Sequence, residues 1–87
     1  MNSRDYFNEY DVVRVKRLDQ PNRHYDGTEN IKHLPRIGDL GTIVHVYSDA
    51  QDMNPTYIVH CVDQNGLTVW LADFTAGELE LVEAVQQ

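Results

Sequence analysis

The sequence contains a single cysteine, Cys61, among its 87 residues. One cysteine excludes an internal disulfide and any zinc site built from several cysteines, and it is typical of a reducing compartment. The first residues lack the apolar core of a secretory signal peptide, and no segment reaches the roughly 20 apolar residues of a membrane span. We therefore expect a cytoplasmic protein with no membrane-embedded part, folded as one domain of residues 1–87.

Lysine and arginine are absent from the second half of the chain. All seven lie at or before Arg36, whereas residues 39–83 carry eight acids and no basic residue. A nucleic-acid-binding protein needs a basic face that neutralises phosphates, and this acidic half would repel a phosphate backbone. We expect the basic residues to offset the acidic half within one fold, so nucleic acid is not the expected partner.

Motifs for catalysis and cofactor binding are also missing. No serine lies in a nucleophile-elbow sequence, and residues 38–41 match neither a dinucleotide-binding nor a phosphate-binding loop. His45 and His60 could approach on neighbouring strands, but a third metal ligand at strand spacing is missing. Glu78 and Glu80 are spaced to share one face of a strand, where they would form a solvated edge that discourages aggregation. The sequence thus predicts a protein that is not an enzyme and has no cofactor.

The sequence does contain short β-strand patterns separated by turn signals. Residues 11–18 alternate apolar and charged side chains, as a strand with one solvated face does. Similar patterns predict strands at residues 42–47, 57–62, 67–72 and 79–83. Residues 1–10 are expected to be either an N-terminal arm laid over the barrel or a short helical turn. Residues 19–35, rich in turn-forming types, are expected to form a long loop between the first two strands. The expected fold is all-β, a small five-stranded barrel.

Two turns carry specific chemistry. Gly38 and Gly41 supply the permissive backbone that a tight turn needs before a β-branched run, and the Asp39 carboxylate can accept hydrogen bonds from turn amides. The pair Asn65-Gly66 between two apolar strands is the strongest short-range signal for a β-hairpin. It predicts a three-residue loop with Gly66 in the left-handed conformation.

This hairpin also predicts a register and an interface. If Asp63 faces Leu67, Cys61 lies opposite Val69 and His60 lies opposite Trp70. The inward positions are then Tyr57, Val59, Cys61, Val69 and Leu71, and the outward positions are Ile58, His60, Val62, Trp70 and Ala72. Tryptophan is enriched at interface hot spots, and an outward apolar strip usually marks an interface. We predict Ile58, His60, Val62 and Trp70 as an outward strip, covered by a second copy of the chain, by a foreign protein, or by Tyr6, Phe7 or Tyr10 of the arm.

Several segments occur in the order found in SH3-like barrels. They are Val13-Arg14-Val15, Leu34-Pro35-Arg36, residues 38–44, Tyr57-Ile58-Val59, and the stretch from Val69-Trp70-Leu71 to Glu78-Leu79-Glu80. The chain resembles the barrel domain of the nitrile hydratase beta subunit and the electron-transport accessory proteins, and it is similar to a bacterial family of small SH3-like domains of unknown function. Residues 38–46 alone resemble the ribosomal KOW motif.

The chain departs from the nitrile hydratase pattern in two respects. It has no metal-binding cysteine cluster, which in that enzyme lies on the other subunit, and it has no helical half before the barrel. The resemblance therefore implies no hydratase activity. It implies a barrel that docks partner proteins.

From these features we predict a non-enzymatic SH3-like barrel that forms a homodimer and binds another protein. The candidate surfaces are the outward strip and the basic loop, with Arg17, Arg23, His24, Lys32 and Arg36. A compact acidic chain of this kind would suit an accessory or immunity-type protein from a mobile bacterial gene. Two alternatives stay open: a small-molecule or metal-responsive domain that uses the loop and His45 or His60, and a KOW-like domain that contacts RNA.

Overall fold

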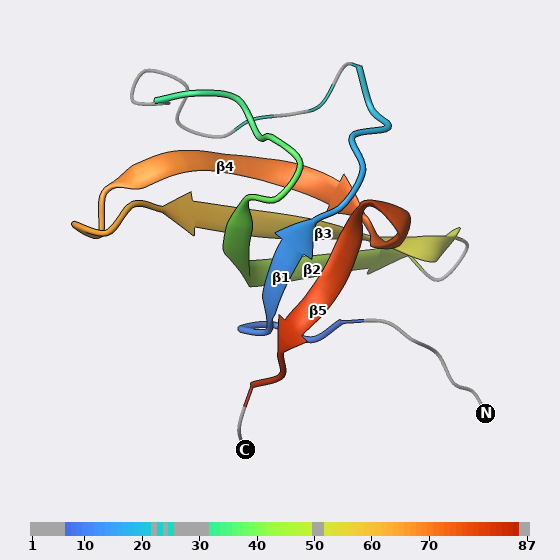
Figure 1. The fold of residues 1–87 in the computed structure, drawn as a ribbon. Coiled ribbons are helices and arrows are strands. Elements are labelled where there is room, and N and C mark those ends of the chain that lie inside the picture. Colours follow the sequence, from blue (N-terminus) through green and yellow to red (C-terminus); the bar gives the residue numbers. More distant parts are fainter. Residues whose placement is uncertain (1–6, 22, 24, 26–31, 50–51, 86–87) are drawn as a thin grey trace.

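A computed structural model of the chain describes residues 7–21, 23, 25, 32–49 and 52–85 (Figure 1). These residues form five antiparallel strands in one sheet and almost no helix. The strands are β1 (Val12–Val15), β2 (Leu40–Asp49), β3 (Asp52–Val62), β4 (Thr68–Thr75) and β5 (Leu79–Glu83), and a single 3-10 turn, η2 (Ala76–Glu78), joins β4 to β5. None of the helical segments within the described ranges is long and apolar enough to cross a membrane.

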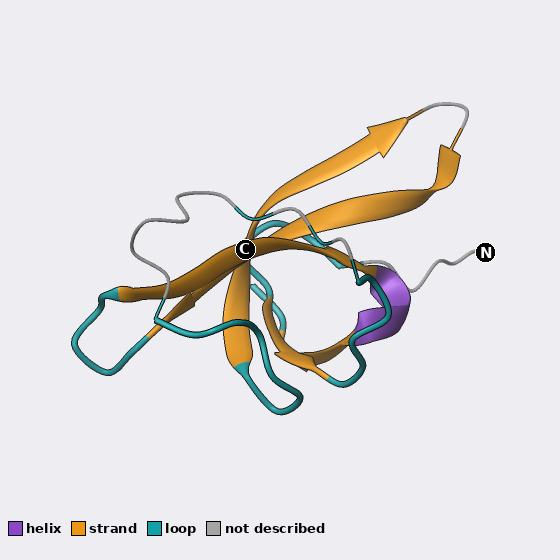
Figure 2. Ribbon diagram, turned by 90° about the horizontal axis from the view of Figure 1, so that it is seen from above, coloured by secondary structure: helices purple, strands orange, loops and turns teal. Residues whose placement is uncertain are grey.

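The all-β class and the five predicted strands are confirmed. The strand order is β4-β3-β2-β1-β5, so β4 and β5 are the two edges of the sheet. No pairing among the described residues joins these edges, so the sheet is not closed into a barrel; Figure 2 shows it curling, with the β2–β3 hairpin projecting from one side. That hairpin is longer than predicted, because residues 52–56, which precede the strand predicted at 57–62, also belong to β3.

The long loop predicted between the first two strands is present as the β1–β2 connection, residues 16–39. Parts of it that the structure describes lie along the outer edge of β4 (Figure 1). The backbone N–H of Lys32 donates to the carbonyl of Val69 at 3.0 Å, and Tyr25 forms a single β-bridge with Ala72. These two backbone contacts tie the connection to β4.

The core is one cluster of mostly β-branched and aromatic side chains, the types that suit a pleated, buried surface. Its buried members are Val13, Val15, Ile43, Tyr57, Val59, Cys61, Val69, Trp70, Ala72, Phe74 and Leu79. Phe7 of the N-terminal arm packs edge-on against Tyr57, with ring centroids 5.3 Å apart, whereas Tyr10 is exposed. The arm thus covers the Tyr57 part of the core, and Tyr6 lies outside the described residues.

The predicted turns are largely confirmed. Gly38 and Gly66 have φ angles of +98° and +81°, in the left-handed region that favours glycine. The Asp63 carboxylate accepts hydrogen bonds from the amides of Asn65 and Leu67 at 2.9 and 3.0 Å, which closes the hairpin loop. Gly41 lies within β2 rather than in the turn. A Cβ at this position would approach Val59 Cγ1 to 2.6 Å, so close packing of β2 on β3 is what requires glycine there.

The hairpin register follows the prediction only near the loop. The N–H of Asp63 donates to the carbonyl of Leu67 at 2.9 Å, and Val62 pairs with Thr68. The register then shifts by one residue, so that Cys61 pairs with Trp70 instead of Val69. The extra residue in β4 is a β-bulge, and a one-residue shift moves every later side chain to the opposite face.

The predicted outward strip is wrong for the residues of β4, because the bulge turns them to the other face. Trp70 is fully buried in the core, and its Nε1–H donates to Asp39 Oδ2 at 2.9 Å; Ala72 is buried as well. Ile58 is also buried, His60 is half-buried, and only Val62 is well exposed. The outward apolar strip expected from simple alternation is therefore absent from this face.

Candidate functional site

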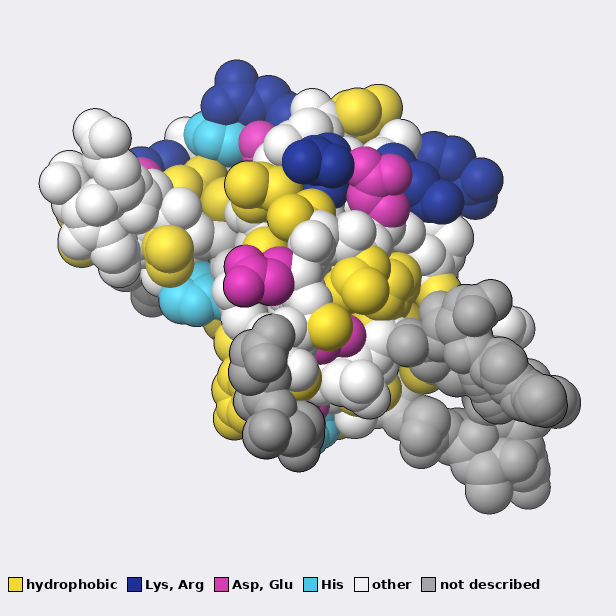
Figure 3. Space-filling view, turned by 60° about the horizontal axis from the view of Figure 1, so that its bottom comes forward, with side chains coloured by type: hydrophobic (Ala, Val, Ile, Leu, Met, Phe, Trp, Pro, Cys, Tyr) yellow, Lys and Arg dark blue, Asp and Glu magenta, His cyan; other side chains and the backbone are white. Residues whose placement is uncertain are grey.

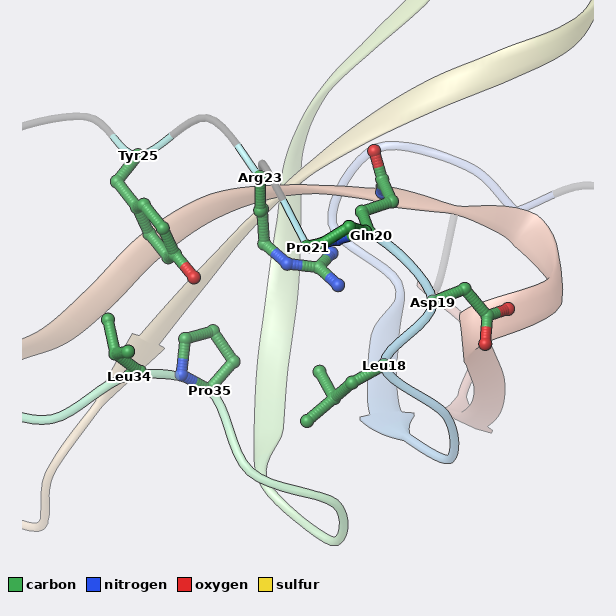
Figure 4. Close-up of a pocket in the computed structure, with 8 residues that line it drawn as sticks. All are labelled: Leu18, Asp19, Gln20, Pro21, Arg23, Tyr25, Leu34 and Pro35. Carbon is green, nitrogen blue, oxygen red and sulfur yellow. The ribbon is translucent and has the colours of Figure 1, made fainter.

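A hollow of about 310 Å³ lies between two parts of the β1–β2 connection. Its lining residues are Leu18, Asp19, Gln20, Pro21, Arg23, Tyr25, Leu34 and Pro35. Figure 4 shows Leu18 on one wall and Leu34 with Pro35 on the other, while the Arg23 side chain reaches between them. The volume is at the small end of ligand sites, suited to one or two side chains of a partner.

Glu78 fixes the first wall of the hollow from a distant part of the sequence. It is fully buried in η2, and its carboxylate accepts hydrogen bonds from Arg23 Nη2 at 2.5 Å and Arg23 Nη1 at 3.1 Å. The same carboxylate accepts from the backbone N–H of Asp19 at 2.6 Å and from Gln20 Nε2 at 2.8 Å. One side chain thus holds residues 19, 20 and 23 against the turn between β4 and β5.

The charge state of Glu78 follows from these contacts. Burial alone would raise the pKa of Glu78, but hydrogen bonds from Arg23, Thr75, Asp19 and Gln20 outweigh it and lower the pKa to about 2. The carboxylate is therefore ionised at neutral pH and balances the guanidinium of Arg23. Buried ions persist when they are paired and fully hydrogen-bonded, as here.

Glu78 and Glu80 do not share the solvated edge predicted for them. Glu80, on β5, is half exposed and pairs with Arg14 at 2.8 Å, which is an ordinary surface contact. Glu78 lies in the turn before the strand, where the N–H of Thr75 donates to its carboxylate at 3.0 Å. The spacing Thr75-x-x-Glu78 is that of a capping box, a signal in the sequence that could have identified this role.

Arg23 is a buried structural cation. Its guanidinium carbon lies 4.3 Å from the centre of the Phe74 ring, and Nη1 donates to the carbonyl of Asp73 at 2.5 Å. With the two bonds to Glu78, these contacts anchor the connection to the edge of β4. Arg23 is therefore not available to a partner in the way predicted for an exposed loop residue.

The other predicted loop residues lie in different settings. Arg17 is exposed and pairs with Asp19 at 2.7 Å, and Lys32 pairs with Asp63 at 2.6 Å, a contact that lowers the pKa of Asp63. Arg36 is exposed, and His24 lies outside the described residues. The pairs of Arg14, Arg23 and Lys32 each join the first half of the chain to an acid of the second half, as the charge distribution predicted.

His45 and His60, the two histidines on strands, have different partners and do not face each other. His45 lies 3.5 Å from Glu9 and packs edge-on against Tyr47, whereas His60 Nε2 lies 2.8 Å from Thr68 Oγ1. Across the β2–β3 pair, His45 faces Ile58 rather than His60. Within the part of the chain that the structure describes, no group of three or more His, Cys, Asp or Glu side chains is arranged to hold a metal ion.

Comparison of the chain with protein-family models, with curated proteins and with solved structures gives no match in any of the three. The hollow itself offers apolar contacts from two leucines and two prolines, and one aromatic ring. Its polar side chains, Asp19, Gln20 and Arg23, already bond Arg17 or Glu78 outside the lining. Such a lining suits the binding of an apolar group.

Proposed function

We propose that this protein is a non-enzymatic interaction module that binds a short segment of another protein in the hollow of the β1–β2 connection. One observation carries the proposal: a concave site whose rim exposes large apolar side chains. Leu18 and Leu34 keep 43% and 59% of their surface exposed on opposite sides of the hollow. Apolar side chains exposed around a concave site are typical of interaction surfaces.

The attachment of the connection to the sheet supports this role. A free loop of this length loses much conformational entropy when it closes on a partner. Here Arg23 is bonded to Glu78 and Asp73, and the Lys32 amide is bonded to Val69. The walls of the hollow are therefore formed before any partner arrives, which lowers the cost of binding.

We further propose that the sheet is of the SH3-like class and that the protein has an accessory role, in which it binds one partner protein. Five antiparallel strands, a long β1–β2 connection and a short turn before β5 support the class. The two alternatives have less support. Four of the six described cations already pair with acids, which leaves few to neutralise an RNA backbone. The histidine contacts given above offer no clustered ligand set for a metal.

Site-specific photo-crosslinking in cells tests the proposed hollow. A photo-reactive phenylalanine analogue in place of Leu34 should give a covalent adduct with a second protein, and Leu18→Asp in the same chain should abolish that adduct. The matched control carries the same analogue in place of Leu67, which is equally exposed at the hairpin loop. An adduct that forms at position 67 but not at position 34, or that survives Leu18→Asp, would contradict the proposal.

We also propose that the homodimer expected from the sequence forms through β5. This strand pairs only with β1 among the described residues, and Leu81 and Val82 are 49% and 42% exposed. A two-fold axis at Leu81 would place Leu81 opposite its own copy and Glu80 opposite Val82, so that no two acids face each other. The mass in solution tests this idea, as set out in the Discussion.

A further inference from the structure

Two cations near the hollow have no ion pair in the described part of the chain. Among six described lysines and arginines, four form ion pairs: Arg14 with Glu80, Arg17 with Asp19, Arg23 with Glu78, and Lys32 with Asp63. The remaining two, Lys16 and Arg36, are exposed. A charge without a partner in the protein is the one most available to a ligand.

Both of these cations are within two positions of a residue that lines the hollow. Lys16 precedes the lining residue Leu18 by two positions, and Arg36 directly follows the lining residue Pro35. The two segments are held together, because the N–H of Gly38 donates to the carbonyl of Val15 at 2.8 Å. The backbone segments that carry Lys16 and Arg36 therefore meet at the same end of the site.

The backbone on this side of the hollow is fixed, and apolar surface continues from it. The Asp39 carboxylate accepts from the N–H of Arg36 at 3.0 Å, so the chain that carries this guanidinium is anchored. Ile37, the next residue, is among the most exposed apolar side chains of the protein. Figure 3 shows lysine and arginine side chains gathered along one side of the molecule, next to exposed apolar ones.

We infer that the segment bound in the hollow belongs to an acidic and apolar peptide, with an apolar side chain in the hollow and a carboxylate against Arg36 and Lys16. This inference rests on the proposed function and adds the chemistry of the partner. The guanidinium fork of Arg36 matches a carboxylate, with which it can form two parallel hydrogen bonds. The described residues offer a basic segment little here, since Asp19 is paired with Arg17 and Glu78 is buried with Arg23.

The overall charge of −7 does not prevent such binding. At physiological salt the Debye length is about 8 Å, so an acidic peptide is influenced mainly by the charges next to it. Among the described lysines and arginines, the two without an ion pair each lie within two positions of a residue that lines the hollow. The overall negative charge slows the approach of an acidic peptide more than it weakens the bound state.

Selection from a phage-displayed library of random peptides tests the inference. The wild-type protein is the target, and the Leu34→Asp variant removes peptides that bind elsewhere. Enriched peptides should carry Asp or Glu next to a large apolar residue. For one such synthetic peptide, Arg36→Gln should weaken binding by about 10- to 150-fold, the range for a charge-assisted hydrogen bond, and replacement of its acid by the amide should do the same. The matched control Arg14→Gln, which removes a cation already paired with Glu80, should leave affinity unchanged.

The possible outcomes separate this inference from the proposed function. Enriched peptides that are neutral or basic, and that bind Arg36→Gln as tightly as wild type, would overturn the inference and leave the hollow as a binding site. Peptides that bind Leu34→Asp as well as wild type, or no enrichment at all, would overturn the proposed function itself.

Discussion

The two edges of the sheet are treated in different ways. Along β4, the β1–β2 connection covers the edge through the Lys32 amide, the Tyr25 bridge and the Arg23 guanidinium. Along β5, the described residues place no strand or loop on the outer side, and Leu81 and Val82 are exposed. Both are known ways to manage an edge: cover it with a loop, or keep the strand short and charged.

This comparison explains where the hollow lies. The connection must reach β4 from the end of β1 and return to the start of β2, so it passes the end of the sheet twice. Its outgoing part is fixed by Glu78 and its returning part by Val69 and Asp39. The space between the two parts is the hollow, so protection of one edge and the shape of the binding site have the same structural origin.

Loss of the buried carboxylate should have the largest effect. In Glu78→Gln the guanidinium of Arg23 stays buried without a counter-charge, which costs about 3–5 kcal/mol of unfolding free energy. Urea unfolding measures it. The control Glu80→Gln breaks the exposed pair with Arg14 and should cost no more than about 1 kcal/mol. Equal losses in the two variants would show that the covered edge does not depend on the buried pair.

Acid should remove the stability that Glu78 contributes at the covered edge over a defined range of pH. The pKa of Glu78 is about 2 in the folded protein and has an ordinary value of 4.5, so the unfolded state binds the proton more readily. The stabilisation by Glu78 is then complete above about pH 4.5 and is lost as the pH falls towards 2. The difference in unfolding free energy between wild type and Glu78→Gln should shrink from pH 6 to pH 3. A constant difference would contradict the lowered pKa.

Asp39 joins Trp70 of β4 to the returning part of the connection through two hydrogen bonds. In Asp39→Ala, the indole N–H of Trp70 and the amide of Arg36 lose their acceptor, and a buried unsatisfied donor costs about 1–3 kcal/mol. Asp39→Asn keeps an acceptor oxygen and should lose less than the alanine variant. Denaturant unfolding followed by tryptophan fluorescence measures both, and an asparagine variant as unstable as the alanine variant would show that charge rather than the hydrogen bond matters.

A substitution on β5, the uncovered edge, should change the stability of the chain least and its assembly most. Leu81→Lys changes a side chain that is exposed in the single chain, so at concentrations where both proteins are monomeric the unfolding free energy should stay within about 0.5 kcal/mol of wild type. Light scattering behind a sizing column should give the wild type a mass near twice the chain's 10.0 kDa and the variant a mass near one chain. Leu67→Lys is the control at an exposed position away from β5. A monomeric wild type, or a dimer that survives Leu81→Lys, would rule out pairing through this edge.

Local patterns in the sequence predicted much of the fold. Alternation located β1 and β5, and the Asn65-Gly66 pair located the hairpin, with the left-handed residue placed correctly at Gly66. The permissive backbone expected at Gly38 was also found. Each of these features is decided by residues a few positions apart. For that reason the strand content could be read from the sequence without knowledge of the tertiary structure.

The features that shape the candidate site depend on distant contacts. Arg23 and Glu78 are 55 residues apart, and no local pattern around either residue predicts that they pair in the core. The bulge in β4 turns Trp70 inward towards Asp39, which is 31 residues away, and period-two alternation cannot reveal an extra residue in one strand. The capping-box spacing at Thr75 was the one local sign of the role of Glu78.

The thiol of Cys61 has a practical consequence. It lies in the core beside Trp70 on the paired strand, and burial raises its pKa to about 11. Thiol reagents react with the thiolate, so this cysteine should stay unmodified at neutral pH while the chain is folded. A second cysteine introduced on the surface would then accept a fluorophore without removal of the native one. In the unlabelled protein, the rate of alkylation of Cys61 would report each opening of the core.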